Sequence, residues 1–424
     1  MEMLQNFFDW FFALGSSVFV PFIMFTLCMV FKGGLTKSLR SALYMGVGLV
    51  GLGLIVDYSV AAMTPVTESL VNNLGLSLNV IDIGYGNVSA AWAWPGVVWV
   101  ILGIIAVNFI MVVLKWTKTL WVDMWNIWHG EFVAGMMWAF TGNIYIGVAS
   151  GLILLVINMK LADYHAKKIQ EFNGLEGISV VATSGTFTAS WAQGCMWVIT
   201  KIPGLRDIKA SSEQIKEKFG IFGEMSVIGA LMGTVMGIVA GFDFINTAQL
   251  AIKLAAVLVI LPRMLSIIAE GIIPISNALS KFMREKFPGR ELYIAVDPAI
   301  LLGDPSVMST VILMYPISVM IAAVIPGCNF LPVASLAALP YWIGGMVPYT
   351  KGNIIHTVIC ATLWIIPATL IASSLAEICT DLCSMTGLFT DQIANGAMFT
   401  NWDEGGNILL WLFVKAGQLF GFGG

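Results

Sequence analysis

The chain has 424 residues, of which 58% are hydrophobic and only 11% carry a charge. Soluble domains carry about 25% charged residues, so this composition excludes an ordinary soluble protein. The mean hydropathy of +0.87 and repeated apolar stretches of about 18 residues predict an all-α protein that crosses a membrane many times. The formal net charge of −4 gives no reason to expect a nucleic acid partner.

Missing motifs exclude several classes of function. The sequence contains no Walker A pattern (GxxxxGK followed by Ser or Thr), so it is not an ATPase subunit, and it contains no GxSxG or HExxH. Six cysteines without a CxxC pair and only three histidines argue against a metal centre, and we expect no cofactor. The first lysine is Lys32, so no basic segment precedes the first apolar stretch and no cleaved signal peptide is expected.

Apolar stretches separated by basic or glycine-rich loops predict about 10–11 membrane spans. Residues 58–75 contain no Lys or Arg, and we expect an external amphipathic segment there. Residues 174–200 are too polar and small to face lipid, so they predict a re-entrant hairpin inside the protein. Residues 201–220 predict a cytoplasmic loop between two halves. The expected spans are 11–31, 41–57, 97–114, 124–141, 143–159, 221–241, 248–270, 307–325, 333–349, 354–373 and 406–422.

The distribution of Lys and Arg predicts that the two halves have opposite orientations in the membrane. A shift of about 215 residues places the base-free segment 58–75 on the basic segment 273–290. The same shift places the basic loop 160–175 on residues 375–390, which contain no Lys or Arg. Because cytoplasmic loops collect bases, we expect an inverted repeat with a periplasmic N-terminus.

Two stretches combine aspartates with residues that break helices. Residues 293–306 read YIAVDPAILLGDPS and contain Asp297 and Asp304, each followed by a proline. A weaker echo about 215 residues earlier, VIDIGYGNVS at 80–89, contains Asp82. Carboxylates and broken backbone at membrane depth are tolerated inside protein or beside a wet cavity, as in the substrate sites of many transporters. The alternative is an ordinary loop with aspartates that cap helices.

Two further polar clusters are candidate binding groups. His129 and Glu131 in the string VDMWNIWHGEFVAG could hydrogen-bond a sugar, or they could belong to an interfacial belt of aromatic residues. Thr183 and Ser184 in the string TSGTFTAS supply hydroxyls suited to a polyol, and small residues of this kind also allow helices to pack closely. Both interpretations stay open for each cluster.

The string TKGNIIHT at 350–357 lies at the cytoplasmic start of an expected span. Lys351 is expected to anchor the topology of that span. Asn353 and His356 are candidate site groups, either in contact with the substrate or behind the residues that touch it.

Five uncommon strings carry a resemblance that covers essentially the whole chain. The strings are VDMWNIWH at 122–129, IKASSEQIKEKFGIFGE at 208–224, LYIAVDPAILLG at 292–303, TKGNIIHT at 350–357 and DEGG at 403–406. With them the chain resembles the galactitol-type enzyme IIC, the membrane permease component of the bacterial phosphoenolpyruvate-dependent sugar phosphotransferase system. Galactitol and ascorbate components form one superfamily.

The resemblance implies a homodimer in the lipid of the bacterial inner membrane. A scaffold formed by the first two spans of each half would hold a mobile core that moves the sugar as an elevator. The implied limits are scaffold 1–60 and core 61–200 in the first repeat, a linker at 201–220, scaffold 221–275 and core 276–405 in the second repeat, and a final span at 406–424.

The resemblance also implies the chemistry. Galactitol, or a related polyol or sugar, would enter from the periplasm. It would be phosphorylated at the cytoplasmic face by a phosphocysteine of a separate IIB protein, and IIA would act through IIB. This chain would be a membrane subunit of a phosphotransferase complex, without a phosphoryl-carrying residue of its own. The basic segments 201–220 and 281–290 are expected to face the cytoplasm and help to dock IIB.

The sequence departs from the galactitol pattern at two places. A His-Gly-Thr-Ser string is expected where this chain has VATSG at 181–185, and a histidine is expected where it has Asp304. Both positions fall in candidate site stretches, so galactitol itself is in question. We expect Asp297 to bind substrate hydroxyls, with Asp82, His129, Thr183 and Ser184 nearby.

Two other functions remain open from the sequence. The chain could be an ion-coupled secondary transporter that uses Asp297 or Asp304 as its proton or cation site. It could also be a membrane receptor that binds a small polyol without transporting it.

Overall fold

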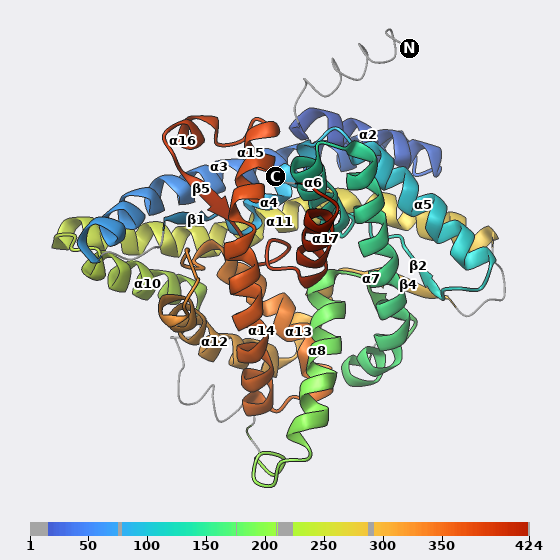
Figure 1. Cartoon of the computed structure of the whole chain (residues 1–424). Coiled ribbons are helices and arrows are strands. Elements are labelled where there is room, and N and C mark those ends of the chain that lie inside the picture. Colours follow the sequence, from blue (N-terminus) through green and yellow to red (C-terminus); the bar gives the residue numbers. More distant parts are fainter. Residues whose placement is uncertain are drawn as a thin grey trace.

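The computed structural model describes residues 16–74, 79–174, 176–208, 210, 224–286 and 292–422. Within these ranges the chain is mostly helical, which is consistent with an all-α membrane protein (Figure 1). Short strands lie between some of the helices. The helices are α2 (Ser16–Val30), α3 (Leu35–Leu74), α4 (Asn87–Ala93), α5 (Val97–Val113), α6 (Trp128–Thr141), α7 (Ile144–Asn173), α8 (Thr183–Ile199), α10 (Met225–Val239), α11 (Phe244–Lys286), α12 (Pro305–Val324), α13 (Leu339–Thr350), α14 (Ile354–Ser374), α15 (Ala376–Met385), α16 (Thr390–Ala394) and α17 (Ile408–Leu419). The strands are β1 (Val80–Asp82), β2 (Thr119–Leu120), β3 (Ile178–Val180), β4 (Tyr293–Val296) and β5 (Met398–Thr400), and the 3-10 segments are η1 (Gly84–Gly86), η3 (Pro298–Gly303) and η4 (Ala334–Ala338).

The two longest helices, α3 and α11, pack against each other across the molecule (Figure 1). Glycine allows this close approach on both sides of the contact. A Cβ added to Gly48 would lie 2.4 Å from Cγ1 of Ile268, and one added to Gly271 would lie 2.8 Å from the backbone nitrogen of Met45. Small residues at such crossings let helix backbones come together in a membrane, where dispersion contacts hold helices in place.

Both long helices continue past the ends expected from the sequence. The separate segment expected at 58–75 is part of α3, which has 40 residues and runs without a break to Leu74. Helix α11 has 43 residues and continues to Lys286 instead of ending near residue 270. The expected domain limits at residues 60 and 275 therefore fall inside helices.

The span count differs from the expected one. Four described helices can cross a membrane by length and composition, and a fifth crossing arises if α4 and α5, which meet at a bend of 89°, are counted as one broken span. Other expected spans are shorter helices, such as α6 with 14 residues and α13 and α17 with 12 each. Within the described ranges, four helices are long and apolar enough to cross a membrane: Leu35–Met63, Ile144–Asn173, Pro305–Val324 and Ile354–Ser374.

Short parallel strands join distant parts of the chain. Strand β1 pairs with β5, which places Asp82 opposite Thr400. Strand β4 lies between β2 and β3, with Val296 opposite Val180. Asp82 ends its strand, and Asp297 directly follows β4, so each aspartate stands where a strand gives way to a 3-10 segment. The strand pairing satisfies backbone groups that could not remain open in lipid.

The hairpin expected over residues 174–200 was wrong: this region forms strand β3 followed by the single helix α8. The first half of α8 is buried, as its small and polar residues indicated. It packs closely on α13, where a Cβ added to Gly345 would lie 2.6 Å from the carbonyl oxygen of Gly185. The small side chains therefore serve close helix packing here.

Side-chain amides begin several helices. Asn143 accepts hydrogen bonds from the backbone of Tyr145 and Ile146 at the start of α7. Asn407 accepts from Leu409 and Leu410 in the same way at the start of α17. These contacts satisfy N–H groups that a helix leaves without partners at its first turn.

Some expectations fall on residues outside the described ranges. These include the N-terminal residues 1–15, most of the cytoplasmic loop (209 and 211–223) and residues 287–291. The bases expected to dock a partner protein at Lys216 and Lys218 therefore have no structural description. Lys281, by contrast, lies exposed on α11.

Candidate functional site

Asp297 takes part in a buried polar network through Asn126. The Nδ2 atom of Asn126 donates to Asp297 Oδ2 at 2.8 Å and to Asp123 Oδ2 at 2.6 Å. Asp123 also accepts the backbone N–H groups of Trp125 and Asn126, both at 3.1 Å, which fixes the turn before α6. One amide group thus holds two carboxylates together.

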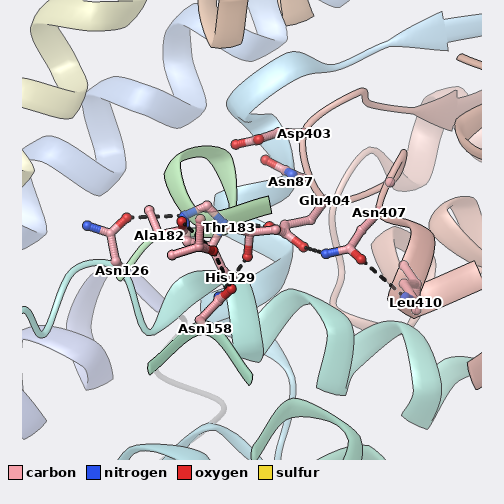
Figure 2. A network of polar contacts seen from close by, with 12 residues as sticks. Asn87, Asn126, His129, Asn158, Ala182, Thr183, Asp403, Glu404, Asn407 and Leu410 are labelled. Carbon is pink, nitrogen blue, oxygen red and sulfur yellow. Dashed lines mark hydrogen bonds and ion pairs between the residues drawn. The ribbon is translucent and has the colours of Figure 1, made fainter. Parts of the chain in front are cut away.

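The network continues from Asn126 to His129 and Glu404 (Figure 2). Because Asn126 Nδ2 faces two carboxylates, its oxygen must face His129, and His129 Nε2 at 3.1 Å carries the hydrogen between them. His129 Nδ1 lies 2.6 Å from Glu404 Oε1, and Asn407 Nδ2 donates to Glu404 Oε2 at 2.6 Å. A proton therefore lies between Nδ1 and Oε1, in a contact that is almost wholly shielded from solvent.

Aromatic rings flank the same network. The ring of Trp128 lies 4.0 Å from that of His129, and Tyr85 meets Trp128 edge-on at 6.2 Å. Tyr341 meets Tyr85 edge-on, also at 6.2 Å. Carboxylates beside aromatic faces can bind the hydroxyls and the C–H face of one carbohydrate.

Two buried carboxyls each keep one oxygen free within the described part of the chain. Asp403 Oδ1 accepts from Trp342 Nε1 at 2.9 Å, whereas its Oδ2 has no partner. Glu131 Oε2 accepts from Trp94 Nε1 at 3.0 Å, whereas its Oε1 has no partner. Buried polar atoms are normally hydrogen-bonded, so each free oxygen indicates a proton, a water or a ligand group that completes it.

Asp82 accepts hydrogen bonds at both of its carboxylate oxygens. Its Oδ1 accepts from Gly84 N at 2.9 Å and from Ser335 Oγ at 2.5 Å, and its Oδ2 accepts from Ser335 N at 2.7 Å. Ser335 Oγ in turn accepts from the backbone of Trp402 at 2.9 Å. Asp82 therefore joins η1, η4 and the loop that follows β5, which positions the loop carrying Asp403 and Glu404.

Known proteins show the same sequence pattern. A family model for the sugar-specific permease component of the PTS system matches residues 10–392. The galactitol-specific EIIC component of Escherichia coli K12 is 32% identical over 405 residues, which cover 95% of this chain and 88% of that protein. A putative permease IIC component from the same strain is 31% identical over 381 residues, 90% of this chain and 87% of that one. This chain belongs to the PTS permease family. The resemblance carried by the five strings is confirmed.

In this PTS permease component, the other expected site residues lie in three places. Thr183 accepts from Asn158 Nδ2 at 2.8 Å at the start of α8, and Ser184 is buried beside it. Asp304 caps α12 by accepting from Ser306 N at 2.9 Å. Its role as a site residue stays a prediction, as does that of Thr183 and Ser184.

Asn353 and His356 fasten the segment that leads into the cytoplasmic loop. Asn353 Oδ1 caps α14, and its Nδ2 donates to the carbonyl of Ile208 at 2.7 Å. His356 Nε2 donates to the carbonyl of Leu205 at 2.8 Å. Within the described part of the chain, neither side chain is bonded to the Asp297 network, and both hold the chain around residues 205–208 in place.

The Asp297 network also contains residues that were not singled out as site residues from the sequence. Asn126 and Asp123 lie in the string VDMWNIWH, and Asp403 and Glu404 lie in the string DEGG. Both strings carried the family resemblance, and that resemblance was the sequence feature that could have pointed to these residues. Tyr85 lies in the Asp82 stretch, but nothing in the spacing of that stretch distinguished it.

Proposed function

We propose that this PTS permease component binds galactitol, or a related polyol or sugar, at the Asp297 network and presents it to a separate phospho-IIB protein. The family supplies the transport function, and one relative is named as specific for galactitol. The observation that carries the location is the chain of contacts from Asp297 through Asn126 and His129 to Glu404, with aromatic rings beside it.

Each part of the network has a role in this proposal. Asp297 accepts hydrogen bonds from adjacent substrate hydroxyls, because a carboxylate forms strong charge-assisted bonds. Asp403 Oδ2, which has no partner within the described residues, accepts another hydroxyl. Tyr85 and Trp128 cover the C–H face of the carbon chain. His129 and Glu404 fix the position of Asn126 and hence of Asp297.

For transfer of the phosphoryl group, this chain then has to position the substrate and supplies no reacting group of its own. A substrate hydroxyl must be held in line with the phosphocysteine of IIB, which brings the reacting atoms together in one orientation. We place this encounter at the cytoplasmic face, where the basic segments 201–220 and 281–290 are expected. IIB docks there in this proposal.

The architecture we propose is an inverted repeat with a scaffold and a mobile core. Two reciprocal strand contacts support it: β1 of the first half pairs with β5 of the second, and β4 of the second half pairs with β3 of the first. Asp82 and Asp297 also each stand where a strand gives way to a 3-10 segment, as two related halves would have them. The packed helices α2, α3, α10 and α11 would form the scaffold of a homodimer, and the remaining helices would carry the substrate as an elevator.

A map of cysteine accessibility in intact cells tests the inverted arrangement. Single cysteines within 160–175 should react only with reagents that cross the inner membrane, and those within 375–390 should react with impermeant reagents. The N-terminus should be periplasmic. Labelling of 160–175 and 375–390 from the same side would contradict the proposal.

Binding and uptake test the function itself. Purified protein should be stabilised against heat by galactitol or by another hexitol, pentitol or disaccharide in a screen, and the best ligand should then be measured by calorimetry. Uptake of that ligand should require phosphoenolpyruvate and should persist in the presence of an uncoupler. Uptake that the uncoupler abolishes would support ion coupling instead, and binding without uptake would support a receptor.

A further inference from the structure

A basic cavity lies at the turn between α2 and α3, away from the Asp297 network. It has a volume of about 1010 Å³ and is bordered by the end of α2, the start of α3 and the last part of α11. Four bases line it: Lys32, Lys37, Arg40 and Lys281. The opposing acids are Glu270 and Glu285, so the four bases and two acids leave a net charge of +2.

The four bases of this cavity have no charged partner within the described residues. None of the four forms an ion pair with another residue that the structure describes, and all four side chains are exposed. Arg40 lies 5.0 Å from the ring of Tyr44, a contact that leaves its charge available. Two segments far apart in the sequence therefore bring unpaired positive charge to one hollow.

An apolar chamber of about 440 Å³ lies on the other side of one aromatic pair. Phe31 and Phe282, whose rings are 5.5 Å apart, line both the basic cavity and this chamber. The chamber follows α5 through Leu102, Ala106 and Phe109. Its polar surface is small, and a volume of this size falls within the range of about 300–1,000 Å³ of small-molecule sites.

The surroundings place both hollows where lipid would be. Val30 and Leu35, on either side of the basic turn, are 65% and 64% exposed. Trp116, just past the end of α5, is 63% exposed, as expected of an aromatic residue at a membrane interface. The chain thus presents bases at headgroup level and an apolar groove that runs from there along a helix.

We propose that these two hollows together form a binding site for one anionic phospholipid. The phosphate of the headgroup lies among Lys37, Arg40 and Lys281, because unpaired bases near a membrane attract anionic lipid. An acyl chain passes Phe31 and Phe282 into the chamber along α5. A free phosphate would use only the basic cavity, and a neutral lipid would use only the chamber.

This lipid joins parts of the molecule that share few other contacts. The basic cavity belongs to the helices α2, α3 and α11, whereas the chamber is lined mainly by α5. A bound lipid adds contacts between these groups of helices, and it should therefore raise the thermal stability of the whole protein by mass action.

Native mass spectrometry of the purified protein tests the proposal with dioleoyl phosphatidylglycerol and dioleoyl phosphatidylcholine as probes. The double variant Lys37→Gln with Lys281→Gln should weaken phosphatidylglycerol binding by roughly 30-fold, which corresponds to two headgroup bases. The matched control is Lys253→Gln with Arg263→Gln, which removes two bases from α11 outside the cavity. It should bind like the natural protein.

A second variant tests the chamber without changing any charge. Ala106→Phe at an exposed position of α5 fills the chamber and should weaken phosphatidylglycerol binding while leaving its preference over phosphatidylcholine intact. Galactitol-type ligands should bind all variants normally, since none touches the Asp297 network.

Several results would overturn the lipid site. Equal binding of the two lipids by the natural protein would exclude recognition of the headgroup. Inorganic phosphate that displaces phosphatidylglycerol at millimolar concentration would indicate a simple anion cavity. Unchanged phosphatidylglycerol binding in the Lys37 and Lys281 double variant would exclude the headgroup contact, whatever the effect of that variant on IIB binding.

Discussion

The Nδ1 atom of His129 lies 2.6 Å from Oε1 of Glu404, although the two residues are 275 positions apart in the chain. Both side chains are almost wholly buried, and both also bind an asparagine. This contact connects the first turn of α6 with the loop before α17. It therefore ties the first half of the chain to the last at the centre of the proposed substrate site.

Glu404→Gln should lower the free energy of unfolding. The substitution removes the acceptor charge opposite His129 but keeps the size of the side chain, and breaking a buried pair in this way costs about 3–5 kcal/mol. Glu377→Gln on the exposed face of α15 is the matched control and should change stability little. The measurement is thermal unfolding in detergent. A double variant with His129→Gln should recover part of the loss, and strict additivity would argue against the pairing.

Asp297→Asn should weaken polyol binding and leave the protein folded. The loss of a charged hydrogen bond corresponds to roughly 1.5–3 kcal/mol of binding free energy. Calorimetry with the best polyol from the screen provides the measurement, and size-exclusion chromatography checks assembly. Asp304→Asn is measured in parallel: Asp304 caps α12, and a loss of affinity in this variant would support the site role expected from the sequence. Unchanged affinity in folded Asp297→Asn would refute a direct contact, and loss of folding would favour a capping role for Asp297.

Gly84→Ala should destabilise the protein through the backbone. Gly84 has a φ of +48°, and a Cβ there would lie 2.6 Å from the carbonyl carbon of Ala334. Overpacking of this kind costs about 1–3 kcal/mol, and the left-handed conformation adds strain. Gly53→Ala in α3 is the control, because a Cβ there meets nothing within 4 Å. A Gly84 variant that unfolds at the same temperature as the control would contradict the close approach.

The double variant Asn353→Ala with His356→Ala should expose the segment before the cytoplasmic loop to proteases. The two side chains hold the carbonyls of Ile208 and Leu205, so their loss releases this segment. Limited trypsin digestion should cut faster after Arg206, while polyol affinity stays normal. Asn395→Ala, which removes only a local contact in an exposed turn, should not change the cleavage rate. A selective loss of polyol affinity would instead support the site role expected from the sequence.

The sequence indicated the Asp297 stretch as a candidate site because its signals are local. Asp297 precedes Pro298 in apolar surroundings, and this combination of charge and broken helix is readable without a structure. Asp304 carries the same signals, yet its contact with Ser306 two residues later is a helix cap. A cap and a ligand-binding carboxylate require the same residue type at the same place, so local sequence could not separate them.

The partners of Asp297 and His129 could not be derived from the sequence. Asn126 lies 171 positions from Asp297, and an asparagine among tryptophans has no periodicity that distinguishes it. The length of α3 was missed for another reason. Residues 58–75 contain no Lys or Arg, which suggested a separate external segment, but packing against α11 and α10 stabilises helix beyond the apolar stretch.

The reciprocal strand pairing also governs the order in which the molecule can be completed during synthesis. Strand β1 emerges from the ribosome early, but its partner β5 begins at Met398, near the end of the chain. The four long spans described above all end by residue 374, so the insertion machinery can place them before β5 exists. A nascent chain that stops short of residue 398 would therefore be embedded in the bilayer with β1 still lacking its partner strand.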